Sequence, residues 1–197
     1  IEQEGIFSVR TPEDAIRIRS FVSDGGVKRA VVIGGGFIGL EMAENLKAQG
    51  VSVTVIDAAG QLLPEIFDPE MAGYIKKHLT QKGIRVLTNT KALRFAGSGR
   101  VTGVQTEGML LPCEMAIMAV GIRPNTAFLQ GSGVELEQGK VLVDQQLRTN
   151  LEDVYAVGDC AMVTNRITGK RQWSPMGSSA NLEGRTLAQV LAGKEKR

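Results

Sequence analysis

Three glycines and one aspartate have the types and spacing that point most directly to chemistry. An apolar run, residues 31–33, leads into a Gly-x-Gly-x-x-Gly segment made by Gly34, Gly36 and Gly39, and Asp57 closes the next apolar run. Free amide groups at the start of a helix attract phosphate, and an acid about 20 residues after the glycines accepts hydrogen bonds from a ribose diol. The pattern therefore predicts a dinucleotide site built from a strand, a tight turn, a helix and a second strand.

Each of the three glycines has a separate expected task. Gly34 permits the tight turn, Gly36 lets the backbone come close to a pyrophosphate, and Gly39 lets the helix pack closely on the strand. The inward face of this helix is expected to consist of Ile38, Met42, Ala43 and Leu46. A glycine-rich turn with a purely structural purpose is the alternative, but it leaves the accompanying strand, helix and acid unexplained.

The residues after Asp57 bear on the choice between NADH and NADPH. Ala58, Ala59 and Gly60 follow it, so no Arg or Lys is in reach to neutralise a 2′-phosphate. An acid without such a partner favours NADH. The alternative is that Asp57 is an N-cap or a surface acid.

The composition is that of a globular chain and argues against several classes of partner. The 197 residues are 43% hydrophobic with a net charge of +2, and the only dense basic cluster is at 194–197, so we expect no nucleic-acid partner. The sequence shows no run of about 18 apolar residues and no secretory leader, so we expect no membrane association and a cytoplasmic protein. The chain begins at Ile1, which suggests a fragment.

The remaining reactive side chains suggest no second site. Cys113 and Cys160 form no Cys-x-x-Cys pair, so we expect neither a redox dithiol nor a zinc site, and both are interpreted as reduced packing residues. His78 has no nucleophile in a recognisable arrangement around it and is not expected to be a general base. We expect no bound metal.

Helix and strand signals before residue 121 predict an α/β unit. One helix should begin at the N-cap Thr11 and end at Gly25, and another should run from Asp68 to Gly83. The inward side chains of the second are expected to be Met71, Ile75 and Leu79. Antiparallel strands of a β-meander are expected at 93–95, 101–105 and 109–111, and a buried parallel strand at 113–120. The predicted fold is a Rossmann-like three-layer domain with a parallel sheet.

The last third of the chain predicts a smaller set of elements. We expect a short strand at 139–144, a buried strand at 154–157 that stops at Gly158, and a closing helix from Ser178 or Ser179 to Gly193. The apolar residues of that helix are Leu182, Leu187, Val190 and Leu191.

Three motifs in this order resemble the pyridine nucleotide-disulfide oxidoreductases, a family of flavoproteins. They are the segments 34–41, 119–125 and 149–159. Within the family, the segments 37–41 and 175–185 are most similar to the branch of coenzyme A-disulfide reductases, NADH oxidases and peroxidases.

The resemblance implies how the chain is divided. Residues 1–10 would be the end of the first FAD-domain segment or a linker, 11–122 the NAD-binding domain, and 123–197 the second FAD-domain segment. Family members carry an FAD-binding glycine motif and a redox cysteine upstream and a dimerisation domain downstream, and this sequence contains none of them. We therefore expect the chain alone to be inactive and not to bind FAD tightly, and the full-length enzyme to be a homodimer.

The resemblance also implies tasks for single residues. Glu41 is similar to a glutamate near the flavin and the nicotinamide, or else is an ordinary first-turn acid. Phe37 is similar to an aromatic residue that covers the flavin until the nicotinamide displaces it, or else packs in the core. Asp159 is similar to the aspartate that binds a ribityl hydroxyl of FAD, or else is a turn acid. The helix near Ser178 would direct its dipole at the pyrimidine edge of the flavin.

Two sets of cofactor contacts follow from the motif and the resemblance together. The residues expected at NAD are Gly34, Gly35, Gly36, Phe37, Ile38, Gly39, Asp57, Ala119, Val120 and Gly121. The residues expected at FAD are Gly158, Asp159, Ser178, Ser179 and Ala180.

The parent protein is expected to pass hydride from NADH to FAD and electrons onward through a cysteine. The final acceptor would be a disulfide, a persulfide, a peroxide or oxygen. Two alternatives stay open: a stand-alone NAD-binding module without turnover, and a ferredoxin-reductase-like flavoprotein without a redox cysteine.

Overall fold

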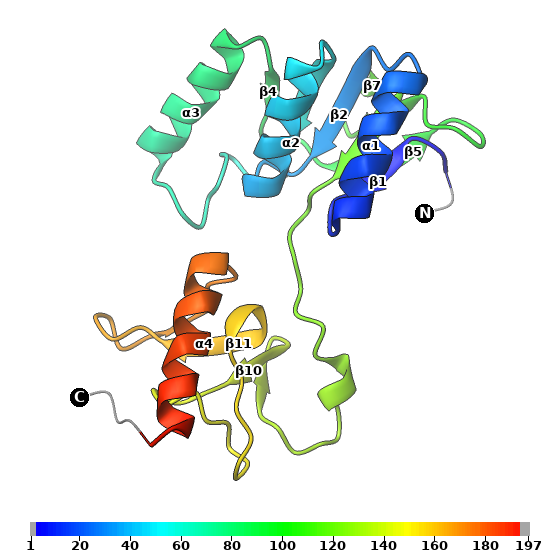
Figure 1. The fold of residues 1–197 in the computed structure, drawn as a ribbon. Coiled ribbons are helices and arrows are strands. Elements are labelled where there is room, and N and C mark those ends of the chain that lie inside the picture. Colours follow the sequence, from blue (N-terminus) through cyan, green and yellow to red (C-terminus); the bar gives the residue numbers. More distant parts are fainter. Residues whose placement is uncertain (1–2, 194–197) are drawn as a thin grey trace. The chain divides into compact units, whose positions relative to one another are not determined.

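The computed structural model describes residues 3–193 and divides the chain into two compact units, Ile1–Gly121 and Ile122–Arg197 (Figure 1). The first unit is built on a five-stranded parallel sheet with the strand order β1-β8-β2-β3-β4. Its strands are β1 (Ile6–Ser8), β2 (Arg29–Ile33), β3 (Ser52–Ile56), β4 (Arg85–Leu87) and β8 (Met115–Met118). We expected residues 1–10 to lie outside this domain, whereas β1 pairs with β8 within its sheet.

Three layers make up the first unit. Helices α1 (Pro12–Asp24), α2 (Phe37–Ala48) and α3 (Pro69–Gln81) lie beside one another along the sheet (Figure 1). The antiparallel meander of β5 (Ala92–Ala96), β6 (Gly103–Thr106) and β7 (Leu110–Pro112) forms a separate three-stranded sheet. The predicted α/β class, three layers and meander are confirmed.

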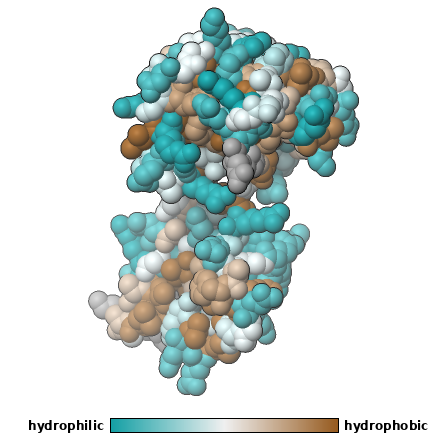
Figure 2. All heavy atoms as spheres, turned by 90° about the vertical axis from the view of Figure 1, so that its right-hand side faces the viewer, coloured by the Kyte–Doolittle hydropathy of each residue, from teal (hydrophilic) through white to brown (hydrophobic). Residues whose placement is uncertain are grey.

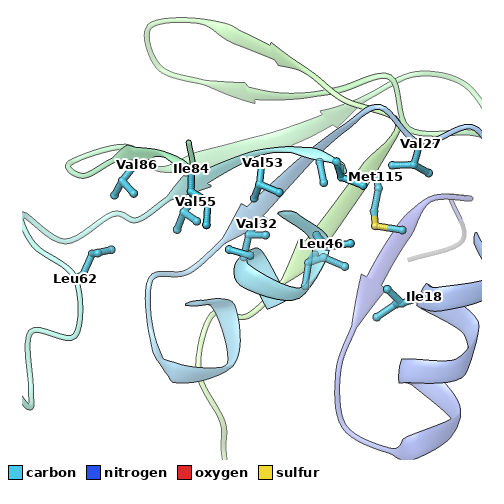
Figure 3. Packing of buried hydrophobic residues seen from close by; sticks show 14 residues of the cluster. Ile18, Val27, Val32, Leu46, Val53, Val55, Leu62, Ile84, Val86 and Met115 are labelled. Carbon is cyan, nitrogen blue, oxygen red and sulfur yellow. The ribbon is translucent and has the colours of Figure 1, made fainter. Parts of the chain in front are cut away.

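Two apolar clusters bind the layers together, because neighbouring residues of a strand face opposite sides of the sheet. Val32 is buried among the helix residues Ile18, Ala43 and Leu46 (Figure 3). Val31, its neighbour, is buried with Val104 of the meander. A strand covered on both faces has to be apolar throughout, which explains the continuous apolar runs in the sequence.

On two helices most of the predicted inward residues pack on the core, but one residue of each does not. In α2 the buried residues are Gly39, Ala43 and Leu46, while Ile38 is 39% exposed. In α3 Ala72 is buried and Met71 is 46% exposed. The expectation that Ile38 and Met71 point inward is wrong. Each lies one position before the residue that packs on the sheet, and one position turns a side chain by about 100° around the helix.

The second unit is a small mixed sheet with one long helix. Its strand order is β12-β11-β10-β9, with β10 parallel to β11 and both edge strands antiparallel. The strands are β9 (Leu136–Glu137), β10 (Lys140–Leu142), β11 (Ala161–Thr164) and β12 (Arg171–Gln172). Helix α4 spans Gly177–Leu191, and 3₁₀ turns occupy Ala127–Leu129 (η1) and Gly158–Cys160 (η2).

The strand predicted at 154–157 does not form. Tyr155 makes only an isolated bridge to Arg148, and Val154 is 38% exposed. The amide of Ala156 donates to the carbonyl of Leu147, so the segment folds back on a local turn rather than pairing in the sheet. The strand that enters the sheet begins later, at Ala161.

The surface of the second unit carries many apolar side chains (Figure 2). No residue of α4 is buried, and Leu182 and Leu191 are 61% and 62% exposed. The buried core of this unit is correspondingly small and centres on Val141, Ala156 and Ala161. Among the described residues, no helix combines the length and the apolar stretch needed to cross a membrane.

One ion pair joins the starts of two neighbouring strands in the first unit. The Glu114 carboxylate accepts hydrogen bonds from the backbone N–H of Arg29 at 2.8 Å and from its Nη2 at 2.5 Å. These bonds from Arg29 hold the pKa of Glu114 below its ordinary value of 4.5. Because the folded-state pKa is depressed, this stabilisation is present above pH 4.5 and is lost as the pH falls through the folded-state pKa.

We expect Glu114→Gln to lower the melting temperature at pH 7, and the difference from the parent chain to shrink below pH 4.5. The measurement is thermal unfolding followed by circular dichroism from pH 3 to pH 8. Glu107→Gln, at an exposed turn between β6 and β7, is the control and should show no such pH-dependent difference. A Glu114→Gln deficit of equal size at pH 3 and pH 7 would contradict the assignment.

Candidate functional site

The glycine turn between β2 and α2 is shaped by two close backbone approaches. Gly34 has φ +109°, and a Cβ at this position would lie 2.2 Å from the carbonyl oxygen of Ala119. A Cβ on Gly39 would lie 1.9 Å from the carbonyl oxygen of Gly34. Neither position has room for a side chain without a backbone shift, so these two glycines set how closely α2 packs on the sheet.

Gly36 differs from both neighbours in the motif. A Cβ built on it meets nothing within 4 Å, and its φ of −80° is accessible to any residue. Packing therefore does not require glycine here, and the position faces open space. This is the arrangement expected where a ligand comes close to the backbone.

The start of α2 supplies unpaired donors at the same place. Its N-cap is Gly36, which makes no side-chain capping bond, and its first turn holds no acidic residue. The amides of residues 37–39 have no acceptor within the helix, because the first amides of any α-helix lack one. These donors and the helix dipole make the turn suitable for a phosphate.

Asp57 lies directly beside the turn, as expected. One oxygen of its carboxylate, Oδ2, accepts from the amide of Gly35 at 2.6 Å, and Oδ1 accepts from the amide of Ala59 at 2.7 Å. Both bonds fix the carboxylate at the carboxyl end of β3, and each oxygen retains a lone pair for a further donor. The carboxylate is therefore not the N-cap of α3, which is Asp68.

The segment after β8 completes this edge of the sheet. The amide of Ala119 donates to the carbonyl of Ile33 at 2.8 Å, which places Ala119 against the glycine turn. Val120 is 66% exposed and Gly121 has φ +97°. Carboxyl ends of neighbouring parallel strands are where ligands bind in such sheets.

Phe37 and Glu41 lie one helical turn apart on α2, so they share a face. The Phe37 side chain is 45% exposed, which removes the alternative that it packs in the core. Glu41 is exposed as well. Their tasks at the nicotinamide and the flavin stay predictions.

In the second unit, η2 and the first turn of α4 meet. A Cβ on Gly158, which has φ +74°, would lie 3.3 Å from the Cβ of Ala180. Helix α4 begins at Gly177 with no side-chain cap, and the hydroxyls of Ser174 and Ser179 lie 2.9 Å apart. The expected flavin residues Gly158, Asp159, Ser178, Ser179 and Ala180 thus come from two elements that are adjacent in this unit.

Two side chains that the sequence did not single out for this task hold the η2 turn. The Glu183 carboxylate accepts from the amide of Gly158 at 2.6 Å. The indole N–H of Trp173 donates to the carbonyl of Asp159 at 2.8 Å, and Lys140 Nζ lies 4.8 Å from the centre of its ring. With its backbone fixed on both sides, Asp159 keeps an exposed side chain.

The cysteines have the packing environments that were expected. Cys113 is buried, and this burial raises the pKa of its thiol to about 11, so it stays protonated at neutral pH. Cys160 is partly buried, and its thiol donates to the carbonyl of Val157 at 3.3 Å.

Comparison with known proteins decides the family. The model for "Pyridine nucleotide-disulphide oxidoreductase" matches residues 1–180. The chain belongs to this family. The pyridine nucleotide-disulphide oxidoreductases bind both NAD(H) and FAD.

Three relatives show how far the likeness extends. An NADH oxidase of Methanocaldococcus jannaschii is 37% identical over 98% of this chain and 43% of its own length. A NAD-dependent persulfide reductase from A. fulgidus has a TM-score of 0.92 and 35% identity over 100% of this chain and 37% of that chain. An engineered water-forming NADPH oxidase derived from a Lactobacillus brevis enzyme has a TM-score of 0.87 and 25% identity over 96% of this chain and 42% of that chain. The chain spans less than half the length of these oxidoreductases.

Gly36→Ala and Gly39→Ala should separate ligand approach from packing in this family member. We expect Gly39→Ala to lower the free energy of unfolding by about 1–3 kcal/mol, because its Cβ meets backbone. Gly36→Ala should cost at most about 1 kcal/mol as an N-cap change, yet weaken NADH binding about tenfold.

Urea unfolding followed by far-ultraviolet circular dichroism and calorimetric titration with NADH measure the two effects of the glycine substitutions. Equal losses of stability in the two variants would contradict the packing argument. Unchanged NADH affinity in Gly36→Ala would contradict the argument for ligand approach.

Glu183→Ala should destabilise the second unit by about 1–3 kcal/mol, because it leaves the amide of Gly158 without its acceptor. Glu183→Gln keeps an acceptor oxygen and is the matched control, with a smaller expected loss. Trp173 is the only tryptophan and lies in this unit, so its fluorescence during urea unfolding reports this unit selectively. Equal losses in the two variants would show that the hydrogen bond does not carry the effect.

Proposed function

We propose that this chain is the NADH-binding part of a flavoprotein oxidoreductase, with a segment of the flavin site in its second unit. One observation carries the proposal: the glycine turn requires glycine for packing at Gly34 and Gly39, while Gly36 faces open space at the uncapped start of α2. A turn with a purely structural purpose has no need of the unfilled position or of the unpaired amides.

The residues of the chain would divide the binding of NADH among them. The amides at the start of α2 donate to the pyrophosphate, and the Asp57 carboxylate accepts from the adenosine ribose diol. Phe37 and Glu41, exposed on one helix face, flank the position of the nicotinamide. FAD, when bound, would supply the hydride acceptor, and the residues of the first unit would orient the nicotinamide.

Nucleotide choice follows from the charge beside the ribose. The Asp57 carboxylate repels a 2′-phosphate, and Ala58 and Ala59 supply no cation to offset it. The engineered NADPH oxidase supports this, because its substitutions include an aspartate replaced by alanine and the following alanine replaced by arginine. The same two residue types follow each other here as Asp57 and Ala58.

In the second unit, the flavin would be bound through Asp159 and the first turn of α4. The η2 turn is held by hydrogen bonds with Glu183 and Trp173, and this favours a flavoprotein over a stand-alone NAD-binding module, which would not need a flavin-binding turn. The electron acceptor of the whole protein, its homodimeric state and its cytoplasmic location stay predictions. A disulfide, a persulfide, a peroxide and oxygen are the acceptor classes that we propose.

The decisive test is calorimetric titration of the chain with NADH and, separately, with NADPH. We expect NADH to bind at least about tenfold more tightly than NADPH, because Asp57 repels the 2′-phosphate. Tenfold corresponds to a difference of about 1.4 kcal/mol in binding free energy. The double substitution Asp57→Ala with Ala58→Arg should reverse the order of affinities. Asp24→Ala, an exposed acid at the end of α1, is the control and should leave both affinities unchanged.

Binding of neither nucleotide would overturn the proposal for this chain. Preference for NADPH by the parent chain would overturn the assignment of Asp57. A purified chain that retains FAD and its yellow colour would contradict the expectation that the second unit alone holds the flavin weakly.

A further inference from the structure

The loop that begins at Asp57, residues 57–68, is hydrogen-bonded to two other segments of the first unit. The amide of Asn89 donates to the carbonyl of Ala59 at 2.8 Å, and the amide of Thr90 donates to the carbonyl of Asp57 at 2.8 Å. The amide of Leu63 donates to the carbonyl of Gly35 at 3.3 Å. The loop thus joins the end of β4 to the glycine turn.

Leu62 anchors the loop through its side chain. It is 1% exposed and belongs to the same buried cluster as Val55 and Val86, toward which it points from the loop (Figure 3). Its Cδ2 occupies the space that a side chain at Gly35 would need, because a Cβ built there lies 2.4 Å from it. Gly35 therefore lacks a side chain in order to leave room for Leu62. Its own φ is not positive and would accept any residue.

Leu63 shows that the loop is held against the preference of its backbone. Its φ is +49°, a conformation in which bulky residues are rarely found, and its side chain is 5% exposed. Such a conformation persists only where the surroundings determine it. Here the burial of the Leu62 and Leu63 side chains holds the backbone of Leu63 in this conformation.

We propose that Leu62, packed in the space left by Gly35, is a positioning residue for nucleotide selection. It acts through Asp57 and the following segment 58–60, which the loop presses against the glycine turn. The inference rests on the proposed NADH site and adds Leu62 as the residue that fixes the position of Asp57 in that site.

Loss of the anchor should reduce selectivity more than overall binding. Asp57 Oδ1 accepts from the amide of Ala59 in the loop at 2.7 Å, so a shifted loop pulls on the carboxylate and changes its position at the ribose. A displaced carboxylate binds the diol less well and repels a 2′-phosphate less strongly. The affinity for NADH falls while that for NADPH rises or holds, so the ratio of the two affinities falls.

The experiment compares the parent chain with Leu62→Val, Gly35→Ala and the double variant. Each is titrated with NADH and NADPH by calorimetry, and its melting temperature is recorded. Leu46→Val is the matched control, because Leu46 is a buried leucine of the same cluster that lies on α2 rather than on the loop. Hydrogen exchange of the Ala59 and Leu63 amides, measured by NMR, reports the loop without any nucleotide.

Leu62→Val should lower the NADH-to-NADPH affinity ratio by about threefold or more and speed exchange at both amides, because binding energy at the ribose depends on geometry. Leu46→Val should lower the melting temperature but leave the ratio and the loop exchange unchanged. Gly35→Ala should weaken NADH binding about tenfold through overpacking, and Leu62→Val should restore part of that affinity in the double variant.

Three results would overturn the inference. They are an unchanged ratio in Leu62→Val with the parent still selective, unchanged exchange at Ala59 and Leu63, and additive losses of NADH affinity in the double variant. Absence of nucleotide binding by the parent chain would instead overturn the proposed function together with this inference.

Discussion

The close approach of α2 to the carboxyl edge of the parallel sheet is the constraint on which the candidate site depends. The carbonyl of Gly34 leaves no room for a side chain at Gly39, and the carbonyl of Ala119 leaves none at Gly34, so the first turn of the helix begins directly at the ends of β2 and β8. The unpaired amides and the Asp57 carboxylate then face one place. A helix set further out would carry its dipole away from the acid.

The glycine turn, the acid and the β-meander could be predicted because their signals are local. Each is a short pattern of residue types whose geometry is fixed by neighbours in sequence, such as the positive φ of Gly34. The helix faces were predicted less well. Ile38 and Met71 are apolar and fit the helical period. Contact with the sheet determines which of two adjacent positions is buried, and the buried ones are Gly39 and Ala72.

Contacts between distant residues gave no signal in one sequence. Glu183 is 25 positions from Gly158, and nothing in the residues around it marks it as the acceptor of that amide. The apolar segment 154–157 has the composition of a strand, yet its backbone partners are in the turn around Leu147. Composition indicated burial there, and Ala156 is indeed buried, but it could not identify the partner.

The four α-helices of residues 3–193 differ in how their first turns are satisfied, and the difference parallels the proposed cofactor sites. Thr11 caps α1 and Asp68 caps α3, each with a side-chain oxygen that accepts a backbone amide. Helices α2 and α4 have no such cap. A capping side chain contributes about 1 kcal/mol to stability, so its absence has a cost that a bound anion or an electron-rich ring edge can offset. In a family that binds NAD(H) and FAD, the two uncapped helices are those whose starts lie beside the expected cofactor residues. Stability and binding thus compete for the same amides, and this chain leaves them free at both places.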